Sequence, residues 1–100
     1  MAPYQVSAEA QNDLFEIWCR IATDSVDLAN RIEGEFYALF ESLGTLPHQG
    51  HVRKDLTKRP VLFFPMHSFL VVYQPDTDPV HIMAVLRGRR DLRRILKERL

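Results

Sequence analysis

The chain has 100 residues, of which 46% are hydrophobic, and no net formal charge; this is the size and composition of one globular domain, here expected to span residues 1–100. Its single cysteine, Cys19, excludes an intramolecular disulfide, and no signal peptide or membrane-spanning run is visible, so we expect a cytoplasmic protein without a membrane partner. The zero net charge conceals an unequal distribution of charge between the two halves of the chain. Residues 1–50 carry two basic and eight acidic side chains, whereas residues 51–100 carry eleven basic and five acidic ones.

The first half of the chain has the pattern of a short strand followed by two amphipathic helices. Residues 3–7 alternate weakly and predict a strand, and Ser7 is a suitable N-cap for the helix that follows. Two runs of apolar residues at helical spacing are separated by residues 23–25, and the second run ends near Gly44, so an antiparallel helical hairpin is predicted. The two apolar stripes are Ala10, Leu14, Ile17, Trp18 and Ile21, and then Leu28, Ala29, Ile32, Phe36, Leu39, Phe40 and Leu43.

The second half of the chain favours strands and ends in a basic helix. Residues 48–59 are polar and predict a loop. Three runs rich in β-branched and aromatic residues follow, each bounded by turn residues, and they predict an antiparallel meander. These runs are Val61–Phe64, Phe69–Tyr73 and Val80–Leu86. A last helix is expected to begin between Gly88 and Leu92 and to dock on the body through Leu92, Ile95, Leu96 and Leu100.

The basic excess is concentrated at residues 87–99, which carry seven basic side chains against Asp91 and Glu98. A polarised surface of this kind can bind an anionic partner such as nucleic acid, an acidic protein or a phosphate. The alternative is a solvated helix face that has no specific ligand. On a helical wheel one face holds Arg89, Arg90, Arg93, Arg94 and Lys97.

The predicted elements follow the order β-α-α-β-β-β with a C-terminal helix, which indicates an α+β fold with the helical hairpin packed on a mainly antiparallel sheet. Along this order lie four short segments, Tyr4-Gln5-Val6-Ser7, Val52-Arg53-Lys54-Asp55-Leu56, Phe69-Leu70-Val71-Val72-Tyr73 and residues 80–91. They resemble the opening, the loop after the second helix, the central strand and the last strand with its turn in the ParE toxins of the RelE/ParE superfamily. The resemblance extends from Tyr4 to about Leu96.

The resemblance implies the toxin of a type II toxin–antitoxin system, held inactive by a cognate ParD-like antitoxin encoded beside it. ParE-like members act on DNA gyrase and block replication, whereas RelE-like members cut messenger RNA on the ribosome. The resemblance also implies that operator DNA is bound only through the complex with the antitoxin. A further possibility is a degenerate toxin whose remaining role lies in a regulatory complex.

The residues favour the gyrase-directed branch, because the groups that RNA cleavage requires are incomplete. Cleavage without a metal needs side chains that transfer protons and cations that stabilise the phosphate. The strands at 61–64 and 69–73 contain no Lys or Arg, and no Tyr or His follows His81. Arginine stays protonated and cannot act as the base. His67 and His81 are the remaining acid–base candidates, so a RelE-type endoribonuclease stays the alternative to a non-enzymatic toxin.

A toxin that is not an enzyme acts by binding its target through part of its surface. The C-terminal turn and basic face are the predicted gyrase contact, since the arginine fork binds carboxylate or phosphate bidentately. We predict no cofactor and no metal, because His48 and His51 lack further ligands nearby. The predicted gyrase-binding residues are Arg87, Arg89, Arg90, Arg93 and Arg94. The predicted antitoxin-binding residues are Trp18, Phe36, Phe40, Arg53, Lys54 and Arg59. The simplest interpretation of the three aromatic residues is that they belong to the core of the hairpin, and one that is exposed would mark the antitoxin groove.

Overall fold

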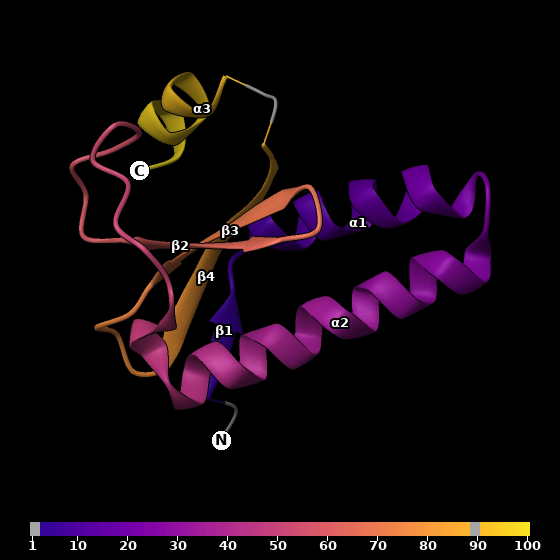
Figure 1. The fold of residues 1–100 in the computed structure, drawn as a ribbon, viewed down its shortest axis with the longest axis horizontal. Helices are drawn as coiled ribbons and strands as arrows, with labels where there is room; N and C mark the ends of the chain where they lie inside the picture. Colours follow the sequence, from indigo (N-terminus) through magenta and orange to yellow (C-terminus); the bar gives the residue numbers. More distant parts are fainter. Residues whose placement is uncertain (1–2, 89–90) are drawn as a thin grey trace.

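In the computed structural model, which describes residues 3–88 and 91–100, three α-helices pack around a four-stranded sheet (Figure 1). This arrangement confirms the predicted α+β fold with its C-terminal helix. The helices are α1 (Ala8–Ala22), α2 (Val26–Thr45), the short 3-10 helix η1 (Pro47–Gln49) and α3 (Leu92–Arg99). The strands are β1 (Tyr4–Val6), β2 (Leu62–Met66), β3 (Phe69–Gln74) and β4 (Val80–Arg87).

The sheet has the strand order β1-β4-β3-β2 and is mainly antiparallel, as predicted. Strand β1 pairs with β4 in the parallel direction. A parallel pair needs a long connection, which the helical hairpin and the first two strands of the meander supply here. The register shifts between Val72 and Tyr73, which pair with Ala84 and Ile82. Met83 is therefore the extra residue of a bulge in β4.

Side-chain caps begin both long helices. The Ser7 hydroxyl accepts a hydrogen bond from the N–H of Ala10 at 3.1 Å, as the sequence predicted, and the Ser25 hydroxyl caps α2 in the same way. The end of α2 lies against the start of β1. A Cβ atom at Gly44 would lie 2.5 Å from the carbonyl oxygen of Pro3, so this close approach requires glycine.

The helical hairpin covers one face of the sheet and forms the larger core. Phe36 meets Phe69 of β3 with ring centroids 5.7 Å apart, and Phe40 meets Tyr4 of β1 at the same distance, both edge to face. The buried residues of this core are Ala10, Leu14, Ile32, Phe36, Phe40, Leu43, Val71, Tyr73, Val80, Ile82 and Val85. Burial of each large apolar side chain stabilises the fold by about 1.5–3 kcal/mol.

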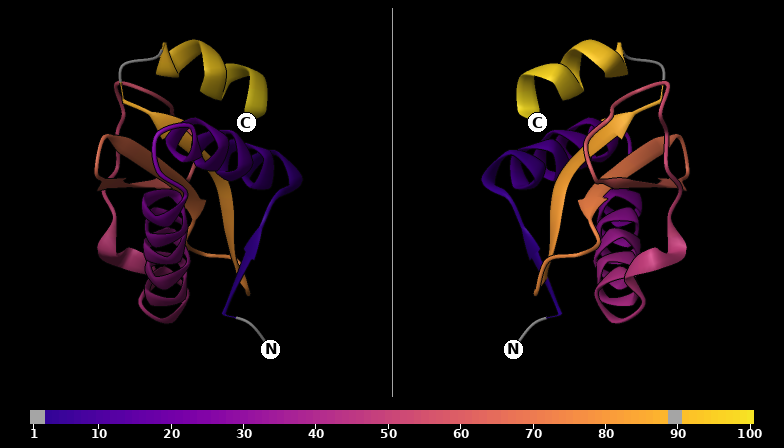
Figure 2. Two further views of the ribbon diagram at one scale, coloured as in Figure 1. Left: turned by 90° about the vertical axis from the view of Figure 1, so that its right-hand side faces the viewer. Right: turned by 90° about the vertical axis from the view of Figure 1, so that its left-hand side faces the viewer.

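Helix α3 covers a second core on the other face of the sheet. Successive residues of a strand point to opposite faces, and in β3 Val71 joins the hairpin core whereas Leu70 and Val72 join the second core. Its buried residues are Val61, Phe63, Leu70, Val72, Ala84, Leu86, Leu92 and Leu96. Figure 2 shows α3 at the end of the molecule opposite the N-terminus. None of the described helices has the long apolar stretch that crossing a bilayer requires.

Candidate interaction surfaces

A buried carboxylate on α1 fastens the C-terminal helix to the rest of the domain. Arg99 donates hydrogen bonds from Nη1 to Oδ2 and from Nη2 to Oδ1 of Asp13, both 2.7 Å long. Asp13 is 6% exposed, and its Oδ2 also accepts from the backbone N–H of Val85 in β4 at 3.0 Å. The hydrogen bond to Asp13 raises the pKa of Arg99. One carboxylate therefore joins α1, α3 and β4.

This contact takes one of the seven basic side chains of residues 87–99 away from the surface. Arg99 Nε also lies 3.5 Å from Glu9 Oε2, so the guanidinium faces two acids of α1. Sequence reasoning assigned no structural role to Asp13. A signal was present, however, because Asp13 falls between Ala10, Leu14 and Ile17 on the apolar stripe of α1, where a charged residue is unexpected.

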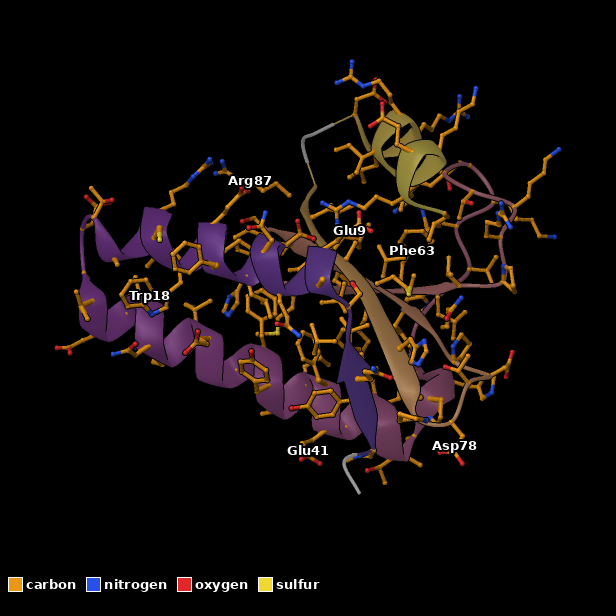
Figure 3. All side chains as sticks on the ribbon, turned by 180° about the vertical axis from the view of Figure 1, so that it is seen from behind. Glu9, Trp18, Glu41, Phe63, Asp78 and Arg87 are labelled. Carbon is orange, nitrogen blue, oxygen red and sulfur yellow. The ribbon has the colours of Figure 1, made fainter. Side chains whose placement is uncertain are left out.

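The predicted gyrase-binding residues that the structure describes, Arg87, Arg93 and Arg94, lie on two different elements. Arg87 is exposed at the end of β4, and Figure 3 shows it beside α1 on the side away from α2. Arg93 and Arg94 are exposed on the first turn of α3. Arg89 and Arg90 lie outside the described residues.

Arg87 borders a small groove of about 260 Å³ between α1 and β4. The apolar residues of its lining come from α1, β3 and β4, and its charged residues include both acidic and basic side chains. The lining residues are Asp13, Glu16, Ile17, Arg20, Ile21, Ser68, Phe69, Val85 and Arg87. Mixed charge gives this groove no strong preference for an anionic or a cationic ligand.

A larger groove of about 760 Å³, the basic groove, lies between α3 and the loop that precedes β2. Figure 1 shows this loop running beside α3. The lining comprises the basic residues Lys54, Lys58, Arg59, Arg93 and Lys97, the apolar residues Leu56, Leu96 and Leu100, and Asp55 and Thr57. Two of the predicted antitoxin-binding residues and one predicted gyrase-binding residue thus share one groove.

The other predicted antitoxin-binding residues have different surroundings. Phe36 and Phe40 are 1% and 0% exposed, so they are core residues and offer no surface to a partner; their apolar-stripe positions already favoured burial. Trp18 is half-buried, and its Nε1 donates to Asn30 Oδ1 at 3.0 Å, which ties α1 to α2. Arg53 is half-buried and engages Asp55 through two hydrogen bonds.

Exposed apolar side chains were missed by the sequence reasoning. Phe15 on α1 is 64% exposed and Val52 in the loop is 61% exposed. Phe15 follows the stripe residue Leu14 directly, so its position on a helical wheel already places it away from the core.

The two histidines that were candidates for acid–base chemistry lie at opposite ends of β3. His67 occupies the β2–β3 turn, where its Nε2 is 3.0 Å from Glu35 Oε2, and His81 pairs with Gln74 at the far end. Five residue steps along a strand correspond to about 17 Å, so the two rings cannot act on one phosphate. Over residues 3–88 and 91–100, no three His, Cys, Asp or Glu side chains are placed to hold a metal ion.

Comparison with known proteins relates this geometry to one family. The family model described as ParE toxin of type II toxin-antitoxin system, parDE, matches residues 4–92. The match begins with β1 and ends at the first residue of α3, so it includes the helical hairpin and the whole sheet. No curated protein matches the sequence.

Proposed function

The chain belongs to the ParE toxin family of type II toxin–antitoxin systems, and we propose that it inhibits DNA gyrase by direct contact and thereby blocks replication. In this proposal the protein acts in the cytoplasm, a ParD-like antitoxin neutralises it, and operator DNA is reached only through the antitoxin complex. The inhibition needs no catalytic group on the toxin, because a tightly bound protein can hold gyrase in one state of its cycle.

The observation that carries this proposal is the rigid presentation of exposed arginines by α3. Leu92 and Leu96 are 8% and 1% exposed in the second core, and Arg99 is held by Asp13. The helix is thus fixed at both ends while Arg94 faces solvent and Arg93, also exposed, is held by a hydrogen bond from its Nε to the Asp55 carbonyl. A preorganised helix loses little conformational entropy on binding, so its guanidinium groups can bind carboxylates or phosphates efficiently.

A gyrase supercoiling assay with purified toxin tests the proposal. The wild-type chain should block supercoiling or accumulate cleaved DNA. Arg94→Glu should raise the concentration for half-inhibition by about tenfold or more, since a charge-assisted hydrogen bond contributes about 1.5–3 kcal/mol. Arg87→Glu combined with Arg94→Glu should raise it further.

The matched control is Arg31→Glu, which makes the same charge change at an exposed position of α2. It should leave inhibition unchanged. Full gyrase activity at saturating wild-type toxin would refute the proposal. Primer extension on a message after induction serves as the second readout, because new cuts in the message would support the RelE-type endoribonuclease instead.

A further inference from the structure

The basic groove combines an apolar floor with a cationic rim. Leu96 is 1% exposed in the second core, and Leu56 and Leu100 pack against that core from the two walls of the groove. The volume of about 760 Å³ is large enough to take apolar side chains of a ligand. Apolar anchors that enter such a site commonly supply most of the binding energy of an interface.

Hydrogen bonds across the groove hold its walls in place. Arg93 Nε on α3 donates to the backbone carbonyl oxygen of Asp55 at 2.6 Å. Within the loop, Arg53 donates to the Asp55 carboxylate at 2.9 and 2.8 Å, and the N–H of Leu56 bonds to the carbonyl of Arg53 at 3.0 Å. The groove is therefore formed before any ligand arrives, which favours tight binding.

The charge of the rim is largely uncompensated. Five basic side chains line the groove against one acidic side chain, Asp55. The Arg53 hydrogen bonds lower the pKa of Asp55, so this carboxylate stays ionised at neutral pH and is already paired with Arg53. Across the described ranges 3–88 and 91–100, no ion pair is formed by any of the five basic residues of the rim. An anionic ligand would remove their mutual repulsion.

The lining distinguishes between two classes of anionic ligand. Sites for single-stranded nucleic acid combine cations with aromatic side chains on which bases stack. Among the residues that the structure describes, no aromatic side chain lines the groove, and its apolar lining consists of three leucines. Leucine side chains match the apolar residues of a peptide, whereas a phosphate backbone would leave them uncovered by apolar groups.

We propose that the basic groove binds an acidic peptide segment with apolar side chains, and that the antitoxin supplies this segment. The inference rests on the proposed function, in which the toxin is neutralised by such a partner. Carboxylates of the segment pair with the rim while its apolar side chains cover Leu96 and Leu100. A segment bound there covers Arg93 and Lys97 and lies next to Arg94, so it denies gyrase access to the basic face of α3.

Selection from a random library of 15-residue peptides tests the ligand class. Peptides are selected on the immobilised wild-type chain and depleted on the variant Lys54→Glu/Lys58→Glu, whose changes lie at exposed loop positions. The retained peptides should be enriched in Asp and Glu together with Leu, Ile or Phe. Retained peptides without acidic enrichment, or no peptide that distinguishes the two chains, would overturn the proposal.

Affinities of a retained peptide then locate the site. Fluorescence anisotropy should show at least about tenfold weaker binding to Lys54→Glu/Lys58→Glu and unchanged binding to the matched reversal Arg20→Glu/Arg31→Glu on the hairpin. Leu100→Ser should weaken binding at least about threefold, and this loss should vanish for a peptide whose apolar residues are replaced by Ser. Tighter binding of a 20-nucleotide single strand than of the peptide would assign the groove to nucleic acid instead.

Competition with the antitoxin encoded beside the toxin tests the source of the segment. The antitoxin should displace the labelled peptide, and binding without displacement would refute this assignment. In cells, Lys54→Glu/Lys58→Glu should stay toxic but escape the antitoxin. Supercoiling inhibition is measured separately for this variant and for the wild-type chain. If the wild-type chain leaves gyrase active but still binds the peptide, the proposal that gyrase is the target is refuted, whereas the proposal that the groove binds the peptide stands.

Discussion

Replacement of Asp13 by Asn should loosen the attachment of α3 without a change in side-chain shape. Both carboxylate oxygens accept a hydrogen bond from Arg99, and Oδ2 also accepts from the N–H of Val85. The amide keeps one acceptor and replaces the other oxygen with a donor. Whichever way the amide is turned, its NH₂ group faces a donor of Arg99, and a buried charge loses its partner.

The magnitude follows from the burial of the pair. Loss of one partner from a buried ion pair costs about 3–5 kcal/mol. The Arg99 side chain is 21% exposed, so water can solvate part of the orphaned guanidinium. We therefore expect Asp13→Asn to lower the free energy of unfolding by about 3 kcal/mol, the lower end of this range. In a domain of about 100 residues each kcal/mol lowers the melting temperature by about 4–8 °C, which gives a decrease of roughly 12–24 °C.

Urea denaturation followed by circular dichroism measures the free energy of unfolding for Asp13→Asn, Arg99→Gln and the double variant. The decrease in the free energy of unfolding of the double variant should be smaller, by about 2 kcal/mol, than the sum of the decreases of the two single variants, because either change alone breaks the pair. Glu33→Gln, at an exposed position of α2, is the control and should change little. A loss below about 0.5 kcal/mol for Asp13→Asn, or additive single losses, would refute the reasoning.

Two further substitutions, one of them with a matched control, test the packing around the loop and at the end of α2. The buried Tyr73 hydroxyl donates to the Pro47 carbonyl at 2.6 Å and accepts from Gly50 N–H at 2.9 Å, so Tyr73→Phe should cost about 1–3 kcal/mol. Burial raises the pKa of Tyr73 in the folded state. The stability that the neutral phenol contributes is therefore complete below the unfolded-state pKa of about 10 and decreases as the pH rises above it. Denaturation at pH 8 and pH 10.5 should accordingly show that Tyr73→Phe loses less stability at the higher pH than the wild-type chain does. Gly44→Ala places a methyl group against Pro3 and should lower stability by about 1–3 kcal/mol in thermal denaturation, whereas Gly34→Ala meets no atom within 4 Å and should raise it by about 0.5–1 kcal/mol. An equal alkaline loss in both chains, or a stabilising Gly44→Ala, would contradict these contacts.

The elements of the fold were predictable because each depends on local pattern. The apolar stripes and the Ser7 cap define the hairpin, and alternation with turn residues defines the meander. The covering of both sheet faces was also encoded, since Leu70 and Val72 are as apolar as the neighbouring Val71. The bulge at Met83 depends on how two strands align, so no single run of residues predicts it.

The sites were less predictable because they depend on contacts between distant residues. Asp13 and Arg99 are 86 positions apart, and only the packing of α3 brings them together. The basic groove likewise joins a loop to a helix that lies about 40 positions later. Phe36 and Phe40 show the opposite case: their apolar stripe predicted burial, which the structure confirms, and this burial leaves them no role at an interface.

The basic side chains of residues 87–99 therefore serve different ends, which the net charge cannot show. Arg99 points inward and orients α3, Arg93 and Lys97 line the basic groove, and Arg94 faces solvent. Asp13 lies neither in the basic groove nor on the exposed face of α3. Its replacement should nevertheless weaken both peptide binding and gyrase inhibition at temperatures where the domain stays folded, because both need α3 in place. Lys54→Glu/Lys58→Glu should weaken peptide binding alone. If Asp13→Asn left both activities intact while α3 was loosened, the position of α3 would not govern either surface.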